Sequence, residues 1–424
     1  MNKNKLYFNS PIGVIGLGYV GLPLAYELSK KYFVQAFDKS LDRVSQLMNN
    51  IDITNQIAKK KLIKISKKIE YSSDIKKLKN CKIYIIAVPT PVYSNKKPDL
   101  RNLKSISKNI SKIIKKDDII VYESTVYPGV TEEICVPLIE KFSNLKLNKD
   151  FYVGYSPERI NPGDKTRQLT DIVKITSASN NYSLSIINKL YNSIIKAGTK
   201  KVSSIKIAES AKVIENAQRD INIAFMNELS IIFDKMNINF NEVLDASKTK
   251  WNFLNFKPGL VGGHCIGVDP YYLAYISKKI GIDPKLILSG REINDNMYKQ
   301  IIFRIKEIFN QKKINFIKSK ILIMGYSFKE NCPDIRNTQI EKIYKELSKK
   351  VQSIEIYDPL LKGQKTDKKF LNYPVANKYN AILILVPHNE FLRMPNKIIK
   401  SFLHKKGFVF DLKSKFKNKE YYKL

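Results

Sequence analysis

The sequence predicts an α/β protein with two doubly wound, Rossmann-like domains joined by a long central helix. Short apolar runs alternate with helical patterns near both ends of the chain, as in parallel sheets covered by helices. A glycine-rich turn of the form G-x-G-x-x-G, from Gly16 to Gly21, follows the first of these runs. Between the two alternating regions, residues 205–236 show the apolar spacing of one long helix.

Length and composition set the first limits. The chain has 424 residues, enough for two or three domains, and 43% hydrophobic residues, which excludes global disorder. No apolar run approaches the roughly 18 residues of a membrane helix, and the N-terminus lacks a signal-peptide pattern, so we expect a cytoplasmic protein. The cysteines lack metal-type spacing, and we expect reduced thiols and no metal site. They are Cys81, Cys135, Cys265 and Cys332.

The formal charge of +35 has two interpretations. It could indicate binding to nucleic acid or an anionic membrane. However, the lysines are spread along the whole chain, and no zinc finger, RNA-recognition signature or basic-region heptad is present. We therefore expect a solvated lysine-rich surface and no nucleic-acid or membrane partner. Steeply salt-dependent retention on DNA would indicate the alternative.

The first turn favours NAD as the cofactor. An apolar run, residues 12–15, precedes Gly16, and helical spacing follows over residues 22–31. A second strand over residues 33–37 ends at Asp38, twenty residues after Gly18. In this context the glycines form the turn and admit a pyrophosphate, and the helix N-terminus offers N–H donors to it. Asp38 would bind a ribose and repel the 2′-phosphate of NADP, a preference that Lys39 and Arg43 soften.

Three further predicted strands end in polar loops. Residues 81–88 lead to Pro89 and Thr90, and residues 117–122 to the segment that ends with Thr125. Residues 151–155 lead to a loop that contains Glu158. Ligands bind at the carboxyl ends of strands in open α/β sheets, so we expect these groups at one edge. A lone glutamate on a loop is more often simply solvated.

The remaining chain divides the molecule into three predicted regions. Residues 1–204 form the NAD-binding domain, 205–311 the long helix with a helical dimerisation and catalytic region, and 312–424 a second Rossmann-like domain. Four strands are expected in the second domain, at residues 320–324, 351–357, 381–386 and 408–410. Its first turn begins at Gly325 and lacks the dinucleotide fingerprint, so we expect it to bind another ligand. On the long helix Lys212, Asn216 and Arg219 share a stripe, which could also be an ordinary exposed one.

The segment 258–272, PGLVGGHCIGVDPYY, is the strongest candidate for a catalytic loop. Cys265 follows the pair Gly262 and Gly263, which would permit close approach of a ligand, and Asp269 comes four residues later. A thiol displayed in this way suits a nucleophile. By itself, a single cysteine is more often a small buried apolar residue.

Along nearly the whole chain the sequence resembles the UDP-glucose/GDP-mannose dehydrogenase family. The matching segments are IGLGYVGLPLA, VPTP, ESTVYPG, SPERINPGD, AESAKVIENAQRDINIAFMNE, GLVGGHCIGVDPYYL and FKENCPDIRN. SPERINPGD, TKWNFL and GGHCIGVDPYYL are most similar to the 6-dehydrogenases of UDP-N-acetylhexosamines (UDP-GlcNAc or UDP-GalNAc). The resemblance implies a homodimer or larger homo-oligomer that makes uronic acids for surface polysaccharides.

The resemblance also implies a mechanism and site residues. Two NAD molecules would take four electrons from the C6 hydroxymethyl group, through a thiohemiacetal and a thioester on the cysteine. The implied catalytic residues are Cys265, Lys212, Asn216, Asp269, Glu158 and Thr125. The implied cofactor residues are Gly16, Leu17, Gly18, Tyr19, Val20, Gly21, Asp38, Arg43, Pro89, Thr90, Thr125 and Arg336. The implied substrate residues are Glu158, Arg159, Ile160, Asn161, Lys212, Asn216, Arg219, Gly262 and Lys329.

Two departures leave alternatives open. Where UDP-glucose enzymes carry a second glutamate and a lysine, this chain has Pro162 and Val268. We therefore expect UDP-GlcNAc as the substrate, with UDP-glucose or UDP-ManNAc as the alternatives, and the activation of water stays open. A nucleotide-sugar sensor without catalysis would need the glycines and Lys329 but not Cys265. His264 could serve as the base of the thiol, although shaping the loop is the simpler role.

Overall fold

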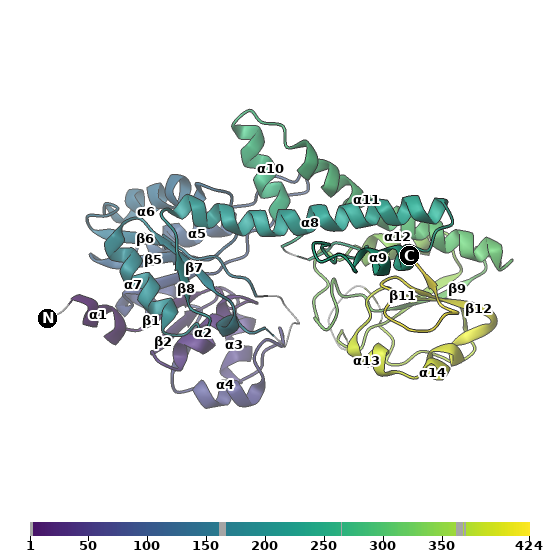
Figure 1. Ribbon diagram of the computed structural model, residues 1–424. Coiled ribbons are helices and arrows are strands. Elements are labelled where there is room, and N and C mark those ends of the chain that lie inside the picture. Colours follow the sequence, from purple (N-terminus) through teal and green to yellow (C-terminus); the bar gives the residue numbers. More distant parts are fainter. Residues whose placement is uncertain (1–2, 161–166, 264, 362–367, 369) are drawn as a thin grey trace. The chain divides into compact units, whose positions relative to one another are not determined.

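The computed structural model describes residues 3–160, 167–263, 265–361, 368 and 370–424. The chain divides into two compact units. The first comprises Met1–Glu215 and Tyr271–Ile282, and the second comprises Asn216–Pro270 and Asp283–Leu424. Helix α8 (Ile205–Lys235) runs from the first unit into the second (Figure 1). In the described part of the chain, no helix is both long and apolar enough to cross a membrane.

The first unit is built on an eight-stranded sheet in the order β3-β2-β1-β4-β5-β6-β7-β8. Its first six strands follow the order of a dinucleotide-binding fold, and they pair in parallel. The strands are β1 (Ile12–Ile15), β2 (Val34–Phe37), β3 (Ile69–Ser72), β4 (Ile83–Ile86), β5 (Asp118–Tyr122), β6 (Phe151–Tyr155), β7 (Lys174–Ala178) and β8 (Thr199–Lys201). The helices are α1 (Lys3–Asn9), α2 (Gly21–Ser29), α3 (Leu41–Met48), α4 (Lys59–Ile65), α5 (Arg101–Ile110), α6 (Val136–Ser143) and α7 (Asn181–Asn192).

The second unit contains a five-stranded parallel sheet in the order β10-β9-β11-β12-β13. Its strands are β9 (Lys320–Met324), β10 (Ser353–Tyr357), β11 (Tyr379–Ile384), β12 (Leu403–Asp411) and β13 (Tyr422–Lys423). Its helices include α9 (Phe240–Ser247), α11 (Lys285–Gln311), α12 (Ile340–Ser348), α13 (Asn389–Arg393) and α14 (Asn396–Ser401). Helix α10 (Asp269–Lys279) begins in this unit and ends in the first.

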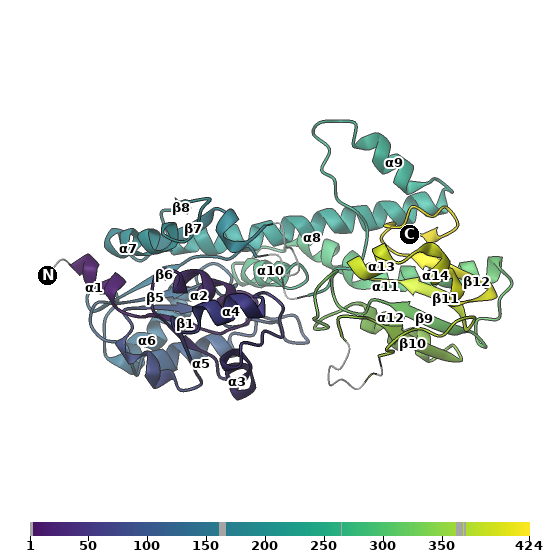
Figure 2. The ribbon, with the colours of Figure 1, turned by 90° about the horizontal axis from the view of Figure 1, so that it is seen from below.

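The second sheet is buried on both faces, as its continuous apolar strands predict. In β9, Ile321 and Ile323 belong to one core cluster, whereas Leu322 and Met324 belong to another. Successive side chains of a strand point to opposite faces, so each face packs against its own helices. Figure 1 shows α12 on one side of this sheet and α13 and α14 on the other, and Figure 2 shows the same unit from below. The prediction of two doubly wound domains joined by a long helix is confirmed.

Some elements differ from the sequence-based expectation. Helix α1 precedes the first strand and was not predicted; its Tyr7 donates a hydrogen bond to the carbonyl oxygen of Asp117. Strand β12 is nine residues long, with a register shift in its pairing to β11, whereas three residues were predicted. Cys135 lies in a π-helical segment, Thr131–Cys135, that continues into α6.

Candidate active site

The glycine-rich turn between β1 and α2 has the geometry of a phosphate-binding turn. Gly16 has a φ of +90°, and a Cβ there would lie 2.6 Å from the carbonyl oxygen of Ala87. A Cβ on Gly21 would lie 1.8 Å from the carbonyl oxygen of Gly16. A Cβ on Gly18 would have none of the described atoms within 4 Å. The fold thus requires the first and third glycines, and the second leaves space for a pyrophosphate at the start of α2.

Asp38 and Arg43 are bonded to the same turn. The backbone N–H of Leu17 donates to Oδ2 of Asp38 over 2.8 Å, and Nε of Arg43 donates to the carbonyl oxygen of Leu17 over 2.9 Å. Arg43 is buried and also forms an ion pair with Asp52. Leu17 is buried, and Tyr19 and Val20 are partly buried. Asp38 therefore supports the turn as well as being available to a ribose.

The ends of β4 and β5 are tied together. Oγ1 of Thr90 donates to the carbonyl oxygen of Thr125 over 2.6 Å. The hydroxyl of Tyr272, in α10, donates to the carbonyl oxygens of Thr90 and Pro91 over 2.9 and 3.2 Å. The carbonyl oxygen of Pro89 accepts a bond from the side chain of Asn102. The ends of β4 and β5 thus bring Thr90 and Thr125 into direct contact, and Pro89 lies beside Thr90 in the chain.

Glu158 is buried, in contrast to the solvated carboxylate that its loop position allowed. Its Oε2 lies 2.9 Å from Nζ of Lys174, and its Oε1 accepts the N–H of Arg159 over 2.6 Å. The same Nζ lies 3.2 Å from Oε1 of Glu123, which also accepts a hydrogen bond from the hydroxyl of Tyr191. We call these four residues, Glu123, Glu158, Lys174 and Tyr191, the buried quartet.

The quartet is an electrostatically coupled group. Burial raises the pKa of Glu123. Burial by itself would lower the pKa of Lys174, but the charges of Glu123 and Glu158 outweigh it and raise the pKa. Sequence reasoning missed Lys174 and Tyr191. The available signal was a lysine at the start of an otherwise apolar and hydroxyl-bearing strand, KITSA.

The Glu158 loop also contacts α8. Nη2 of Arg159 donates to the carbonyl oxygen of Lys212 over 3.2 Å, and the guanidinium pairs with Glu215. Ile160 packs against the core of the first unit. Asn161, which was predicted to bind substrate, lies outside the described residues. The first unit thus brings Glu158, Arg159 and Lys212 together.

The predicted stripe on α8 is not an ordinary exposed one. Lys212 and Asn216 are buried, whereas Arg219 is exposed. In the second unit, Nδ2 of Asn216 lies 2.5 Å from Oδ2 of Asp269, the first residue of α10. Asp269 is fully buried. The carbonyl oxygen of Cys265 accepts the N–H of Asp269 over 2.8 Å, so the cysteine and this pair form one local arrangement.

Cys265 differs from the other cysteines. It is exposed, whereas Cys81, Cys135 and Cys332 are buried, and none of the four forms a disulfide. Burial raises the pKa of Cys81, and it raises the pKa of Cys135 to about 12. These buried thiols are therefore poor sources of a nucleophilic thiolate at neutral pH.

The two glycines before Cys265 have a packing explanation that the sequence did not provide. A Cβ on Gly263, where φ is +84°, would lie 2.6 Å from the ring of Phe328. A Cβ on Gly262 would lie 2.8 Å from the carbonyl oxygen of Asn337. The glycine pair lets the cysteine loop pack closely against the segment that follows β9. His264 lies outside the described residues.

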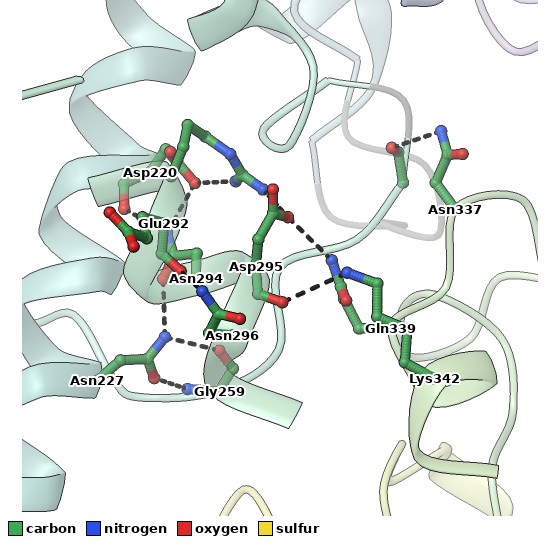
Figure 3. A network of polar contacts seen from close by, with 12 residues as sticks. Asp220, Asn227, Gly259, Glu292, Asn294, Asp295, Asn296, Asn337, Gln339 and Lys342 are labelled. Carbon is green, nitrogen blue, oxygen red and sulfur yellow. Dashed lines mark hydrogen bonds and ion pairs between the residues drawn. The ribbon is translucent and has the colours of Figure 1, made fainter. Parts of the chain in front are cut away.

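The start of the cysteine loop is held by a buried polar network (Figure 3). Nδ2 of Asn227 donates to the carbonyl oxygen of Gly259 over 3.1 Å, and the N–H of Gly259 donates to Oδ1 of Asn227 over 2.7 Å. Asn227 also donates to Asn294, which in turn donates to Asp220. Asp220 forms a buried ion pair with Arg291. Sequence reasoning missed this network, because its bonded partners are 32 to 74 residues apart.

Lys329 and Arg336 lie in the loop after β9. Within it, the hydroxyl of Ser327 donates to the carbonyl oxygen of Lys329, and Arg336 forms a two-point ion pair with Asp334. Asp358 accepts the N–H groups of Tyr326 and Ser327 and bonds to His388. The loop is therefore fixed to the carboxyl edge of the second sheet, where ligands of such sheets bind.

Comparisons with known proteins agree with this arrangement. Three models of the UDP-glucose/GDP-mannose dehydrogenase family match: the NAD binding domain at residues 10–195, the central domain at 206–296 and the UDP binding domain at 322–418. This chain belongs to the UDP-glucose/GDP-mannose dehydrogenase family. The predicted family, the NAD cofactor and the oxidoreductase class of an NAD-dependent nucleotide-sugar dehydrogenase are thereby confirmed.

Individual members of the family are similar over almost the whole chain. A UDP-N-acetyl-D-glucosamine 6-dehydrogenase from Salmonella typhi is 48% identical over 406 residues, which cover 95% of each chain. One from Pseudomonas aeruginosa is 45% identical over 406 residues, covering 95% of this chain and 96% of that protein. A solved UDP-D-ManNAc dehydrogenase from Pyrococcus horikoshii is 28% identical, with a TM-score of 0.85 over 96% of each chain.

Proposed function

We propose that this chain oxidises the C6 hydroxymethyl group of UDP-N-acetyl-D-glucosamine to the carboxylate, with reduction of two NAD. The observation that carries the proposal is the exposed Cys265, bonded through its backbone to Asp269 and thereby to Asn216. A thiol in this setting is suited to hold an aldehyde-level and then an acyl-level intermediate. A dehydrogenase that removes only two electrons from an alcohol needs no nucleophilic thiol.

The chemistry balances in three steps. The alcohol loses a hydride to the first NAD and a proton to solvent or base, which leaves an aldehyde. The thiolate of Cys265 adds to the aldehyde carbon, and loss of a second hydride from this thiohemiacetal leaves a thioester. Water then adds to the thioester, the carbon–sulfur bond breaks, and the acid leaves with Cys265 restored. NAD supplies the hydride acceptor, and the chain supplies binding, orientation and proton handling.

The residues take the following proposed roles. Lys212 and Asn216 stabilise the oxyanions that develop at C6, an electrostatic effect often worth several kcal/mol. Asp269, Thr125 and Glu158 handle the water and its proton. The proposed cofactor residues are Gly16, Leu17, Gly18, Tyr19, Val20, Gly21, Asp38, Arg43, Pro89, Thr90 and Arg336. Proposed substrate residues are Arg159, Ile160, Asn161, Arg219, Gly262 and Lys329.

The choice of sugar rests on similarity. The relatives named for UDP-N-acetyl-D-glucosamine are 45–48% identical to this chain, whereas the solved UDP-D-ManNAc enzyme is 28% identical. Val268, at a position where UDP-glucose enzymes carry lysine, is buried and apolar. Both points favour UDP-GlcNAc over UDP-ManNAc and UDP-glucose. Synthesis of surface polysaccharide is the role that we propose for the product.

The proposal includes a homodimer in the cytoplasm, where NAD and nucleotide sugars are both supplied. Along α8, large apolar side chains are exposed at intervals of 7 to 11 residues, which places them near one face of the helix. They are Ile207, Ile214, Phe225 and Ile232. A second copy of the chain would cover them.

The test is a panel of UDP-sugars with NAD, in which NADH is recorded and the product mass is determined. We expect the highest kcat/KM with UDP-GlcNAc. The product should be about 14 mass units heavier than the substrate, because CH₂OH becomes COOH. A higher kcat/KM with UDP-glucose or UDP-ManNAc would overturn the choice of sugar. Tight binding of UDP-sugars without NADH would indicate a sensor.

A further inference from the structure

We infer that Lys174 is a positioning residue for the hydrolysis of the thioester, because its ammonium group orients the carboxylate of Glu158, which accepts a proton from the attacking water. The inference rests on the proposed function, in which Glu158 handles that water. Lys174 lies at the start of β7, outside the motifs that carry the family resemblance.

The contacts of Lys174 leave it little freedom. Its Nζ lies 2.9 Å from Oε2 of Glu158, 3.2 Å from Oε1 of Glu123 and 3.2 Å from the carbonyl oxygen of Pro157. These three oxygens match the three donors of an ammonium group. The side chain is 2% exposed. Two of the three acceptors belong to the Glu158 loop, so Lys174 fixes both the backbone and the carboxylate of that loop.

The charge of the quartet explains why the ammonium is needed. Two buried carboxylates face one another across a single cation, and burial keeps the phenol of Tyr191 neutral by raising its pKa. Among the described residues, Arg159 is also next to Glu158, and its guanidinium pairs with Glu215. Burial raises the pKa of Glu123. The ammonium of Lys174 lies between the two carboxylates and is closer to that of Glu158.

In the step itself, a water oxygen bonds to the acyl carbon, and its proton passes to Glu158. The bond from this carbon to Sγ of Cys265 breaks, and the sulfur leaves as a thiolate. No electrons are exchanged with NAD in this step. Loss of the ammonium would leave two buried carboxylates without the cation between them, which disfavours their charged forms and removes the contact that orients Glu158. Both effects weaken Glu158 as the acceptor of the water proton.

The experiment compares Lys174→Met with Lys82→Met in the full-length enzyme. Lys82 also pairs with a buried carboxylate, that of Asp118 over 2.6 Å, but at the opposite end of the strands. With UDP-GlcNAc and NAD, Lys174→Met should release two NADH per site in a rapid burst and then turn over about 10²-fold more slowly at pH 7. The acyl adduct on Cys265 should be visible by mass spectrometry. The acid limb of the pH–rate profile should move to higher pH by about one unit or more.

Other outcomes overturn the inference. A lost burst in Lys174→Met, or a pH profile equal to that of Lys82→Met, would give Lys174 a structural role. If Lys174→Met does not fold, the double variant Lys174→Met/Glu123→Gln, which carries one buried carboxylate fewer, is measured for the same burst and adduct. An absence of NADH with every UDP-sugar in the unaltered enzyme would overturn the proposed function itself, and the inference with it.

Discussion

Replacement of Asn227 by alanine tests whether the buried network of Figure 3 holds the loop that carries Cys265. The side chain is fully buried and bonds the N–H and the carbonyl oxygen of Gly259 as well as Oδ1 of Asn294. Alanine leaves these three groups without their partner. Each buried polar group left unsatisfied costs about 1–3 kcal/mol. At the low end of that range, the three groups together cost about 3 kcal/mol.

The direct assay is hydrogen exchange at the amide of Gly259. A local loss of about 3 kcal/mol corresponds to exchange about 10²-fold faster in the peptide that contains this glycine. Asn227→Asp should raise the exchange rate less, because its carboxylate still accepts the N–H of Gly259 but cannot donate to the oxygens of Gly259 and Asn294. The matched control is Asn296→Ala, which removes a partly buried asparagine whose exposed hydrogen bond to the carbonyl oxygen of Glu292 lies within the same helix. Equal exchange in Asn227→Ala and Asn296→Ala would refute the reasoning.

Three further predictions concern single side chains. Cys265→Ser should lower turnover by more than about 10³-fold while Kd for NAD and UDP-sugar stays nearly unchanged, because the nucleophile carries the covalent steps; equal loss in Cys81→Ser would contradict it. Asp38→Asn, which retains an acceptor for the N–H of Leu17, should narrow the ratio of kcat/KM between NAD and NADP by about tenfold, or ~1.4 kcal/mol; an unaltered enzyme that prefers NADP would contradict it. Glu209 accepts the N–H groups of Gly129 and Thr131, and burial raises its pKa to about 7. Because the folded state binds this proton more tightly than the unfolded one, its contribution to stability is present below about pH 4.5 and is lost as pH rises through 7. Glu209→Gln should flatten this part of the pH dependence in urea unfolding, and an unchanged dependence would count against the assignment.

The fold could be predicted because local sequence patterns specify it. In the turn from Gly16 to Gly21, the first and third glycines lie where a Cβ would collide with backbone atoms, so only glycine fits there. The strands after the turn are continuous apolar runs. Strand ends were less predictable. β12 extends to residue 403 through exposed, lysine-rich positions, where pairing with β11 and not hydrophobicity defines the strand.

The residues of the candidate site could be proposed from the sequence, but their burial and their contact partners could not. Glu158 could be placed on a loop, but its burial depends on Lys174, which lies 16 residues away on another strand. Similarly, the glycine pair before Cys265 indicated close approach, but the partner proved to be Phe328. Such long-range contacts leave little trace in a single sequence, since each residue has an ordinary local role.

The number of NADH molecules formed per sugar tests the central claim most directly. A limiting amount of UDP-GlcNAc is incubated with the enzyme and excess NAD until the absorbance of NADH, at about 340 nm, stops rising. The proposed thioester route through Cys265 predicts two NADH and one uronic acid for each sugar. One NADH per sugar, with the free aldehyde as the product, would contradict it.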